Sequence, residues 1–361
     1  MAVSVAGSDR EGASLTGSRR STPPSQEKVA TISDVARLAG VSPMTVSRVV
    51  NNQAGVKAST REAVTAAVTA LGYSPNAAAR SLARAGAGRI GLLYSNPSSG
   101  YLGEILLGAL EGAHKSGAQL LIGKCDSDTA SEQAAIQRLI SEGAGGLILP
   151  PPHGESWTAI AEIEAHGVEA VAIAAGRFRS VATSIRIDDM AAAAEMTRYL
   201  LSLGHRRIGF IKGAQNQSAS AERLIGFETE LSQADPSAEG LIESGEFTYR
   251  SGFEAAERLL AARRPPTAIF ASNDEMAVAA IAAARRRGLD VPRNLTVVGF
   301  DDTPLAATIW PALTTVRQPI AEMAEAAVTR LVRGSSDDPE DRDRVVDHAL
   351  VIRESSGPPE A

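Results

Sequence analysis

The chain has 361 residues, of which 44% are hydrophobic and 22% charged, the composition of an ordinary globular protein. A chain of this length predicts at least two domains. No apolar run approaches the ~20 residues that a membrane-spanning helix needs, and the single cysteine, Cys125, excludes an internal disulfide, so we expect a cytoplasmic protein with no membrane partner.

The net charge of −6 is unevenly distributed along the chain. Residues 31–88 carry six basic side chains against two acidic ones, a balance of +4, whereas residues 89–361 carry 26 against 37, a balance of −11. A small cationic segment on a large acidic body indicates a polyanionic partner for that segment, with chance clustering as the alternative. Residues 1–30 are rich in Ser, Gly and Pro and lack the apolar core of a secretion signal, so we expect a disordered leader.

From Ile32 the sequence ISDVARLAGVSPMTVSRVVN predicts two short helices around a tight turn. Ser33 is expected to cap the first helix, and Val35 and Leu38 to lie on its apolar face. Gly40 ends this helix.

Ser42 is expected to cap the second helix, with Pro43 in its first turn and Val46 and Val49 facing inward. The outward side chains are then Met44, Thr45, Ser47 and Arg48. A third helix, Ser59–Leu71, opens with a predicted capping box from Ser59 to Glu62. Its expected buried residues are Val64, Ala67, Val68 and Leu71.

Three such helices over residues 31–75 predict a helix-turn-helix domain, whose second helix enters the major groove of DNA. Hydroxyl groups on that helix suit phosphate oxygens, and Arg48 can bind a guanine through two hydrogen bonds. The alternatives are a small helical bundle with a polar face, or a helix-turn-helix that contacts another protein.

The segments TVSRVVN, GYSPN and ARSLA resemble the lactose/galactose-repressor family of bacterial transcription factors. The resemblance implies that residues 76–88 form a hinge helix on DNA, with Leu82 wedged into the minor groove. NAAARSLA alone is too short to be a stable helix, so it would order only with DNA and a partner hinge; a plain interdomain linker is the alternative. The DNA-binding residues implied are Thr31, Ser42, Pro43, Met44, Thr45, Ser47, Arg48, Asn51, Asn76, Ala79 and Leu82.

In the rest of the chain, short apolar runs alternate with amphipathic helices. Alternation of this kind predicts parallel sheets covered by helices on both faces. The seven runs expected to form strands are RIGLLY, QLLIG, GGLILP, VEAVAIA, RRIGFI, TAIFAS and LTVVGF. The predicted fold class is therefore a small all-α helix-turn-helix domain followed by an α/β core of two doubly wound lobes.

The resemblance extends to about residue 353 through LGHRRIGFI, SAERLIGF, TAIFASND, VVGFDDTPLA and WPALTTVRQPI. It implies a periplasmic-binding-protein-like core over residues 89–353 that also carries the dimer interface. Lobe 1 is expected at about 89–187 and 318–347, lobe 2 at about 188–317 and 348–353, with a disordered tail at 354–361.

Ligands of such folds lie at the carboxyl ends of strands and between lobes. The effector-binding residues that the matched motifs imply are Ser95, Arg223, Phe247, Asn273 and Asp301, with Tyr101 and Glu104 as weaker candidates at the rim. These side chains suit vicinal hydroxyls and the face of a sugar ring, which favours a carbohydrate. For each residue alone, the alternative is a polar group that caps a loop.

Motifs of enzymes are missing from the sequence: it has no phosphate-binding glycine loop, no nucleophile elbow and no zinc-ligand spacing among its five histidines. We therefore expect neither an enzyme nor a bound cofactor or metal. The predicted function is a dimeric, ligand-responsive repressor of carbohydrate-utilisation genes, bound to an operator in double-stranded DNA and so associated with the nucleoid. A solute-binding receptor without a regulatory role is the alternative.

Overall fold

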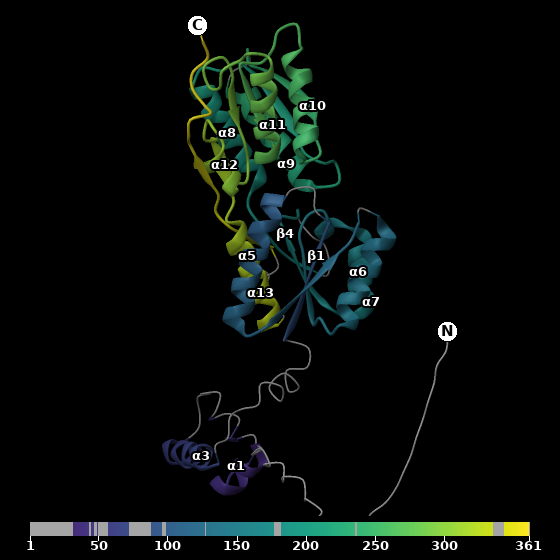
Figure 1. The fold of residues 1–361 in the computed structure, drawn as a ribbon, viewed down its shortest axis with the longest axis vertical. Helices are drawn as coiled ribbons and strands as arrows, with labels where there is room; N and C mark the ends of the chain where they lie inside the picture. Colours follow the sequence, from purple (N-terminus) through teal and green to yellow (C-terminus); the bar gives the residue numbers. More distant parts are fainter. Residues whose placement is uncertain are drawn as a thin grey trace, which may run out of the picture. The chain divides into compact units, whose positions relative to one another are not determined.

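The computed structural model describes residues 32–42, 45–46, 49, 57–71, 88–95, 99–126, 128–176, 182–234, 237–334 and 343–360. The chain forms two compact units, residues 1–82 and 83–361 (Figure 1). None of the helices in the described ranges is long and apolar enough to cross a membrane.

The first unit has a small helical core. It contains α1 (Ile32–Ala39) and α3 (Ala58–Ala70), and Thr45, Val46 and Val49 between them are also helical. The buried residues of this core are Val35, Ala36, Val46, Val49, Val64 and Ala67. The inward positions predicted for Val46 and Val49 are thus confirmed.

Four predictions about these helices were wrong. Ser33 is not the N-cap of the first helix, because α1 already begins at Ile32. The buried face of α1 is centred between Val35, Ala36 and Ala39, so at 100° per residue Leu38 points about 110° away from it and is 57% exposed. Leu71 follows the last helical residue of α3 and is 37% exposed. The capping box at Ser59 does not form, because α3 begins at Ala58 and its N-cap is Lys57, which makes no side-chain cap bond.

Lobe 1 of the second unit is a six-stranded parallel sheet in the order β11-β5-β4-β3-β1-β2. Its strands are β1 (Arg89–Tyr94), β2 (Gln119–Lys124), β3 (Gly146–Leu149), β4 (Glu169–Ile173), β5 (Ala182–Arg186) and β11 (Asp343–Val345). Its helices are α5 (Ser99–Ser116), α6 (Thr129–Ser141), α7 (Trp157–His166), α13 (Ile320–Arg333) and the short 3-10 helix η1 (His153–Glu155). In Figure 1, α5 and α13 lie on one side of β1 and β4, and α6 and α7 on the other. Side chains alternate accordingly along β1: Ile90 and Leu92 pack in the core under α5 and α13, and Leu93 packs in the core under α6 and α7.

Lobe 2 is a four-stranded parallel sheet in the order β7-β6-β8-β9. Its strands are β6 (Arg207–Lys212), β7 (Glu239–Ser244), β8 (Ala268–Ala271) and β9 (Thr296–Val298). Its helices are α8 (Asp189–Ser202), α9 (Ser218–Ala234), α10 (Tyr249–Leu260), α11 (Asp274–Arg286) and α12 (Pro304–Thr308). Phe210 and Phe270 turn toward Phe227 of α9, whereas Ile211 and Ile269 pack in the core with α10 and α11.

The chain passes between the lobes three times, at residues 187–188, 318–319 and 346–348. The second and third passages lie beside β10 (Thr315–Arg317) and β12 (Ala349–Val351), which pair antiparallel. All seven predicted strands are present, and the predicted fold class is confirmed. The structure adds β5, β7, β10, β11 and β12, which the sequence patterns did not indicate.

Helix α5 contacts α13 closely because two glycines lie one turn apart on its contact face. A Cβ atom at Gly108 would lie 1.9 Å from the carbonyl oxygen of Ala321, and one at Gly112 would lie 2.9 Å from Cβ of Val328. Gly103, on the same helix, has no atom within 4 Å of such a Cβ. The close contact therefore requires glycine at Gly108 and not at Gly103.

We expect Gly108→Ala to lower the free energy of unfolding by about 1–3 kcal/mol, because the helices must separate. Gly103→Ala is the matched control and should raise it by up to about 1 kcal/mol through helix propensity alone. Chemical denaturation measures both, and equal effects of the two substitutions would contradict this account.

Candidate functional site

The turn between the first two helical segments is held by hydrogen bonds. Gly40 adopts the left-handed conformation, with φ +65°, and the Val41 amide donates to the Ala36 carbonyl at 3.0 Å. Ser42 Oγ accepts from the Thr45 amide at 3.2 Å and lies 2.9 Å from Thr45 Oγ1. Ser42 thus caps the second helical segment, as predicted, and Thr45 is on its first turn.

Of the predicted DNA-binding residues, the structure describes Ser42 and Thr45. The others lie outside the described residues: Thr31, Pro43, Met44, Ser47, Arg48, Asn51, Asn76, Ala79 and Leu82. The buried positions of Val46 and Val49 fix which side of the segment is turned inward.

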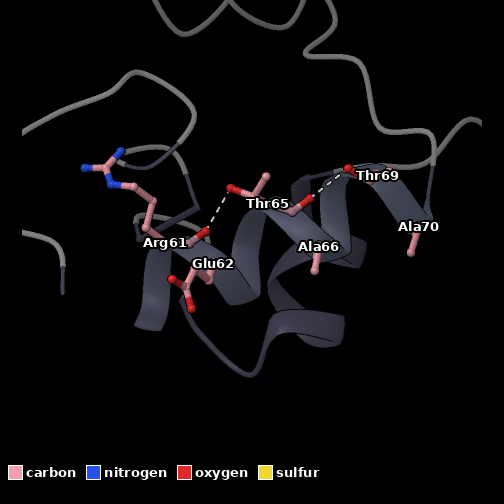
Figure 2. A pocket seen from close by; sticks show the side chains of 6 residues that line it. All are labelled: Arg61, Glu62, Thr65, Ala66, Thr69 and Ala70. Atoms are coloured by element: carbon pink, nitrogen blue, oxygen red, sulfur yellow. Dashed lines mark hydrogen bonds between the residues drawn. The ribbon is translucent and has the colours of Figure 1, made fainter. Parts of the chain in front are cut away.

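Helix α3 borders an open hollow, shown in Figure 2, that Arg61, Glu62, Thr65, Ala66, Thr69 and Ala70 line. The two threonine hydroxyls donate to carbonyls of their own helix, Thr65 to Arg61 at 2.9 Å and Thr69 to Thr65 at 3.1 Å (Figure 2). Their hydrogens are therefore already used within α3. Of the described residues that line it, only Arg61 and Glu62 are charged, and their side chains point apart in Figure 2 instead of converging as in a ligand site.

In the second unit, Arg223 of α9 is a buried cation, 3% exposed. Its Nε donates to Asp189 at 2.7 Å and its Nη1 to the Ser272 carbonyl at 2.5 Å. Its guanidinium carbon lies 3.6 Å from the centre of the Phe300 ring, and Nη1 lies 3.9 Å from Asp301. One buried guanidinium thus faces two buried carboxylates, which compensates part of the cost of taking these charges out of water.

Burial raises the pKa of Asp301 well above its usual range, although Arg223 opposes the rise. The Asp301 carboxylate accepts from Gln318 Nε2 at 2.7 Å. Burial also raises the pKa of the Tyr101 hydroxyl. Among the described residues this buried hydroxyl has no hydrogen-bond partner, and neither has the buried Oε1 of Gln318. Buried polar atoms without partners are uncommon in native proteins and often mark functional sites.

Asn273 and Phe247 lie beside this cluster. Asn273 caps α11, because its Oδ1 accepts from the Met276 amide at 2.9 Å, and its Nδ2 donates to the Phe247 carbonyl at 3.1 Å. Phe247 has φ +56° and is buried against Gly213, where an added Cβ would lie 1.9 Å from the ring. Both side chains are therefore engaged within lobe 2.

The next residue, Asp274, is fully buried. Its carboxylate accepts from the Thr303 amide at 2.7 Å, from Thr303 Oγ1 at 3.0 Å and from Thr315 Oγ1 at 2.6 Å. Burial raises its pKa to about 7 despite these hydrogen bonds.

A cleft of about 910 Å³ lies between the lobes. It is bounded by segments that follow β1, β2 and β3 in lobe 1 and β6 and β7 in lobe 2. The carboxyl ends of parallel strands from both sheets thus meet at one opening, as expected for a ligand site in this fold class.

At the floor of the cleft, Ser95 begins a chain of hydrogen bonds. Ser95 Oγ lies 2.8 Å from Nε2 of His153, and His153 Nδ1 lies 2.5 Å from Oε1 of Glu132. The second oxygen of Glu132 accepts from Ser156 Oγ at 2.5 Å. His153 and Glu132 are buried, so the imidazole is fixed in orientation.

Glu155 of lobe 1 binds the first turn of α9 in lobe 2. One oxygen accepts from the Ser218 amide at 2.7 Å. The other accepts from the Gly176 amide at 2.9 Å and from the Ser218 hydroxyl. A carboxylate at a helix N-terminus is stabilised by the free amides there, so Glu155 links the lobes at the edge of the cleft.

The passages between the lobes are also linked by ion pairs. Asp302 binds Arg317 of β10 and Arg353 after β12, each at 2.7 Å. Arg186 of β5 binds both oxygens of Asp343 of β11, at 3.0 and 3.2 Å.

The structure thus divides the predicted effector-binding residues into groups. Five of them gather around Arg223 or next to it: Tyr101, Arg223, Phe247, Asn273 and Asp301. Ser95 lies apart from them and lines the cleft. Glu104 is half-buried on α5, and among the described residues no hydrogen bond or ion pair links it to either group.

Sequence patterns missed Glu132, His153, Glu155 and Asp189. Asp189 had a usable signal, since it begins a helix directly after a predicted passage between the lobes. His153 had a weaker one, because it follows β3 at the carboxyl edge of the sheet. Across the described residues, no group of three or more His, Cys, Asp or Glu side chains is arranged to hold a metal ion.

We expect the contribution of Asp274 to the free energy of unfolding to fall as the pH rises from about 4 to about 7. Asp274 has a raised pKa in the native state, so the native state binds its proton more tightly than the unfolded state, and this stabilisation is lost as the pH rises. In Asp274→Asn this contribution is absent, so the change in the free energy of unfolding over this range should differ by on the order of 2 kcal/mol. Urea denaturation at pH 5 and pH 8 measures this, with the exposed Asp290→Asn as control; an unchanged pH dependence in Asp274→Asn would refute it.

Glu155→Gln should weaken the link between the lobes by about 1–3 kcal/mol, because an amide has one acceptor oxygen and no charge. The amides of Gly176 and Ser218 should then exchange hydrogen faster, as measured by mass spectrometry. Glu246→Gln, across the cleft, is the matched control and should leave both amides protected. Equal protection in the two variants would count against the link.

Comparisons with known proteins agree with this geometry. Residues 31–76 match the model of "Bacterial regulatory proteins, lacI family", and residues 197–356 match that of a "Periplasmic binding protein-like domain". The "HTH-type transcriptional regulator DegA" of Bacillus subtilis (strain 168) is 36% identical over 332 residues, which cover 91% of this chain and 98% of the relative.

Two solved structures are similar over 91% of this chain and 100% of theirs, each with 29% identity and a TM-score of 0.68. One is the "transcriptional regulator CelR-cellobiose complex", and the other is the lac repressor dimer bound to operator and the anti-inducer ONPF. These are regulators, which confirms the predicted function class over an enzyme or a plain receptor. The chain belongs to the LacI family of bacterial transcription regulators, the family that its own motifs resembled.

Proposed function

We propose that this regulator is a repressor of carbohydrate-utilisation genes, in which an effector bound between the lobes changes the affinity of the first unit for DNA. The observation that carries this proposal is the occurrence, on one chain, of a helix-turn-helix core and a cleft lined by two α/β lobes. A solute-binding receptor would need the lobes but has no use for the helical unit.

The DNA partner is a near-palindromic operator in double-stranded DNA, bound by a homodimer. The similar lac repressor structure is a dimer bound to operator, which supports this arrangement. Two second helices would then lie in successive major grooves, with Thr45, Ser47 and Arg48 toward the DNA. Leu82 from each hinge would open the central base step. DNA binding would place the protein in the cytoplasm, on the nucleoid.

The effector is a carbohydrate held near Ser95 and the cluster around Arg223. The CelR structure contains cellobiose, which supports this class of ligand. Sugar hydroxyls both donate and accept, so they suit the unpartnered Tyr101 hydroxyl and Gln318 Oε1 as well as the Asp301 carboxylate.

Switching works through the passages between the lobes. A ligand that contacts both lobes stabilises one orientation of lobe 1 on lobe 2, and this orientation determines the spacing of the two hinges in the dimer. To move the population from one state almost fully to the other, the ligand must prefer one by ~5 kcal/mol.

Deletion of residues 31–88 tests whether DNA binding belongs to the first unit and effector binding to the second. Operator fragments are first selected from genomic DNA with the full chain. We expect the deleted form to lose all retardation of these fragments, because the helix-turn-helix and hinge are gone, yet to bind the same carbohydrate with unchanged affinity in calorimetry. Retardation by the deleted form would overturn the assignment of DNA binding to the first unit.

A further inference from the structure

We infer that the cleft selects a neutral or amine-bearing carbohydrate and rejects sugar acids and sugar phosphates. The inference rests on the proposed function, since it describes the ligand of that same cleft. Two independent observations carry it: the direction of the hydrogen bonds at the floor, and the charge of the walls.

The floor presents an acceptor. The Glu132 carboxylate can only accept, so His153 Nδ1 is the donor of their 2.5 Å hydrogen bond. In the form of His153 that carries one proton, on Nδ1, Nε2 has a lone pair and accepts the hydroxyl hydrogen of Ser95, 2.8 Å away; the Cys125 thiol also lies beside this nitrogen, at 3.5 Å. With its hydrogen used, Ser95 offers lone pairs to the cleft, which suit a hydroxyl or ammonium donor and repel the oxygens of an anion.

The walls are acidic. Among the described lining residues, the carboxylates outnumber the ammonium group of Lys124 by five to one. They are Asp126, Asp128, Glu132, Glu155 and Glu246. The buried cation Arg223 does not balance them, because it already faces Asp189 and Asp301. An anionic ligand would therefore meet repulsion from both lobes.

Three of these carboxylates are held by the protein. Glu132 binds His153, Glu155 binds the start of α9, and Asp128 caps α6 by accepting from the Ser131 amide at 2.9 Å. Asp126 and Glu246 are exposed, one on each lobe, and their carboxylates make no hydrogen bond among the described residues; only their backbone amides do, to Ser131 Oγ and Ser251 Oγ. They are thus the carboxylates that a ligand can approach without breaking the fold.

Trp157 also lines the cleft and is 86% exposed. An exposed indole provides a flat apolar surface for the C–H face of a sugar ring. It is one of two tryptophans in the chain, so its fluorescence reports binding at this cleft, and Trp157→Phe removes that signal.

The test uses the full chain and matched ligands. Cellobiose, glucose and glucosamine are titrated beside cellobionate, glucuronate and glucose 6-phosphate, within a panel of neutral, amino, acidic and phosphorylated mono- and disaccharides. Binding is followed by tryptophan fluorescence and calorimetry. We expect the tightest ligand to be neutral or amine-bearing, with its acidic counterpart at least about tenfold weaker.

The double variant Asp126→Asn with Glu246→Gln should reduce the ratio between the dissociation constants of the acidic and the neutral sugar about fivefold or more, because both free carboxylates lose their charge. Glu142→Gln with Glu228→Gln, exposed and outside the cleft lining, changes the net charge equally and is the matched control, for which the ratio should stay the same. An acidic sugar that binds best, or a ratio that changes equally in both double variants, would overturn the inference and leave the sensor function standing. If no carbohydrate in the panel binds, the carbohydrate effector of the proposed function is itself wrong, and the inference falls with it.

Discussion

The arrangement of the second unit depends on one buried cation. Arg223 cannot be neutralised, so wherever it is buried it must be paired. Its partners come from far apart in the chain: Asp189 directly follows the first passage between the lobes, and Asp301 is bonded to Gln318 at the second. The ion pairs therefore fix the positions of both passages relative to α9. Removing one partner would leave a buried charge uncompensated, so this cluster specifies geometry more than it contributes net stability.

Much of the fold could be predicted from the sequence, because buried parallel strands are continuous apolar runs with helices between them. The strands that the sequence did not reveal lack that signal. β7 is an edge strand with alternating exposure, β5 contains polar Thr183 and Ser184, and β10, β11 and β12 have three residues each. The error at Leu38 had a different cause: in a helix as short as α1, two adjacent buried residues shift the centre of the apolar face by half a residue's rotation.

The candidate site was only partly predictable. Polar residues after strands identify the correct edge of a sheet, as Ser95, Asn273 and Asp301 show. The same rule does not say which side chain turns into the cleft, because a helix cap and a ligand contact use the same residue types. Asn273 caps a helix. Phe247 has a positive φ and a buried side chain, neither of which the sequence pattern predicted. The hydrogen bonds of Ser95 depend on side chains brought together only by the fold.

The strand pairs β5–β11 and β10–β12, from which the passages between the lobes begin or end, have a mechanical consequence. In lobe 1 the first and third passages begin side by side, because β5 pairs with β11. In lobe 2 the start of the second passage lies beside the end of the third, because β10 pairs antiparallel with β12. Each pair is reinforced by an ion pair, at Arg186 and at Asp302. Bending of one passage would strain the strand pair and the ion pair that link it to its neighbour, so we expect the passages to move together as one hinge. Any ligand that favours one position of this hinge would then produce the same output, whichever atoms it touches, and the recognition chemistry of the cleft could change while the motion stays the same.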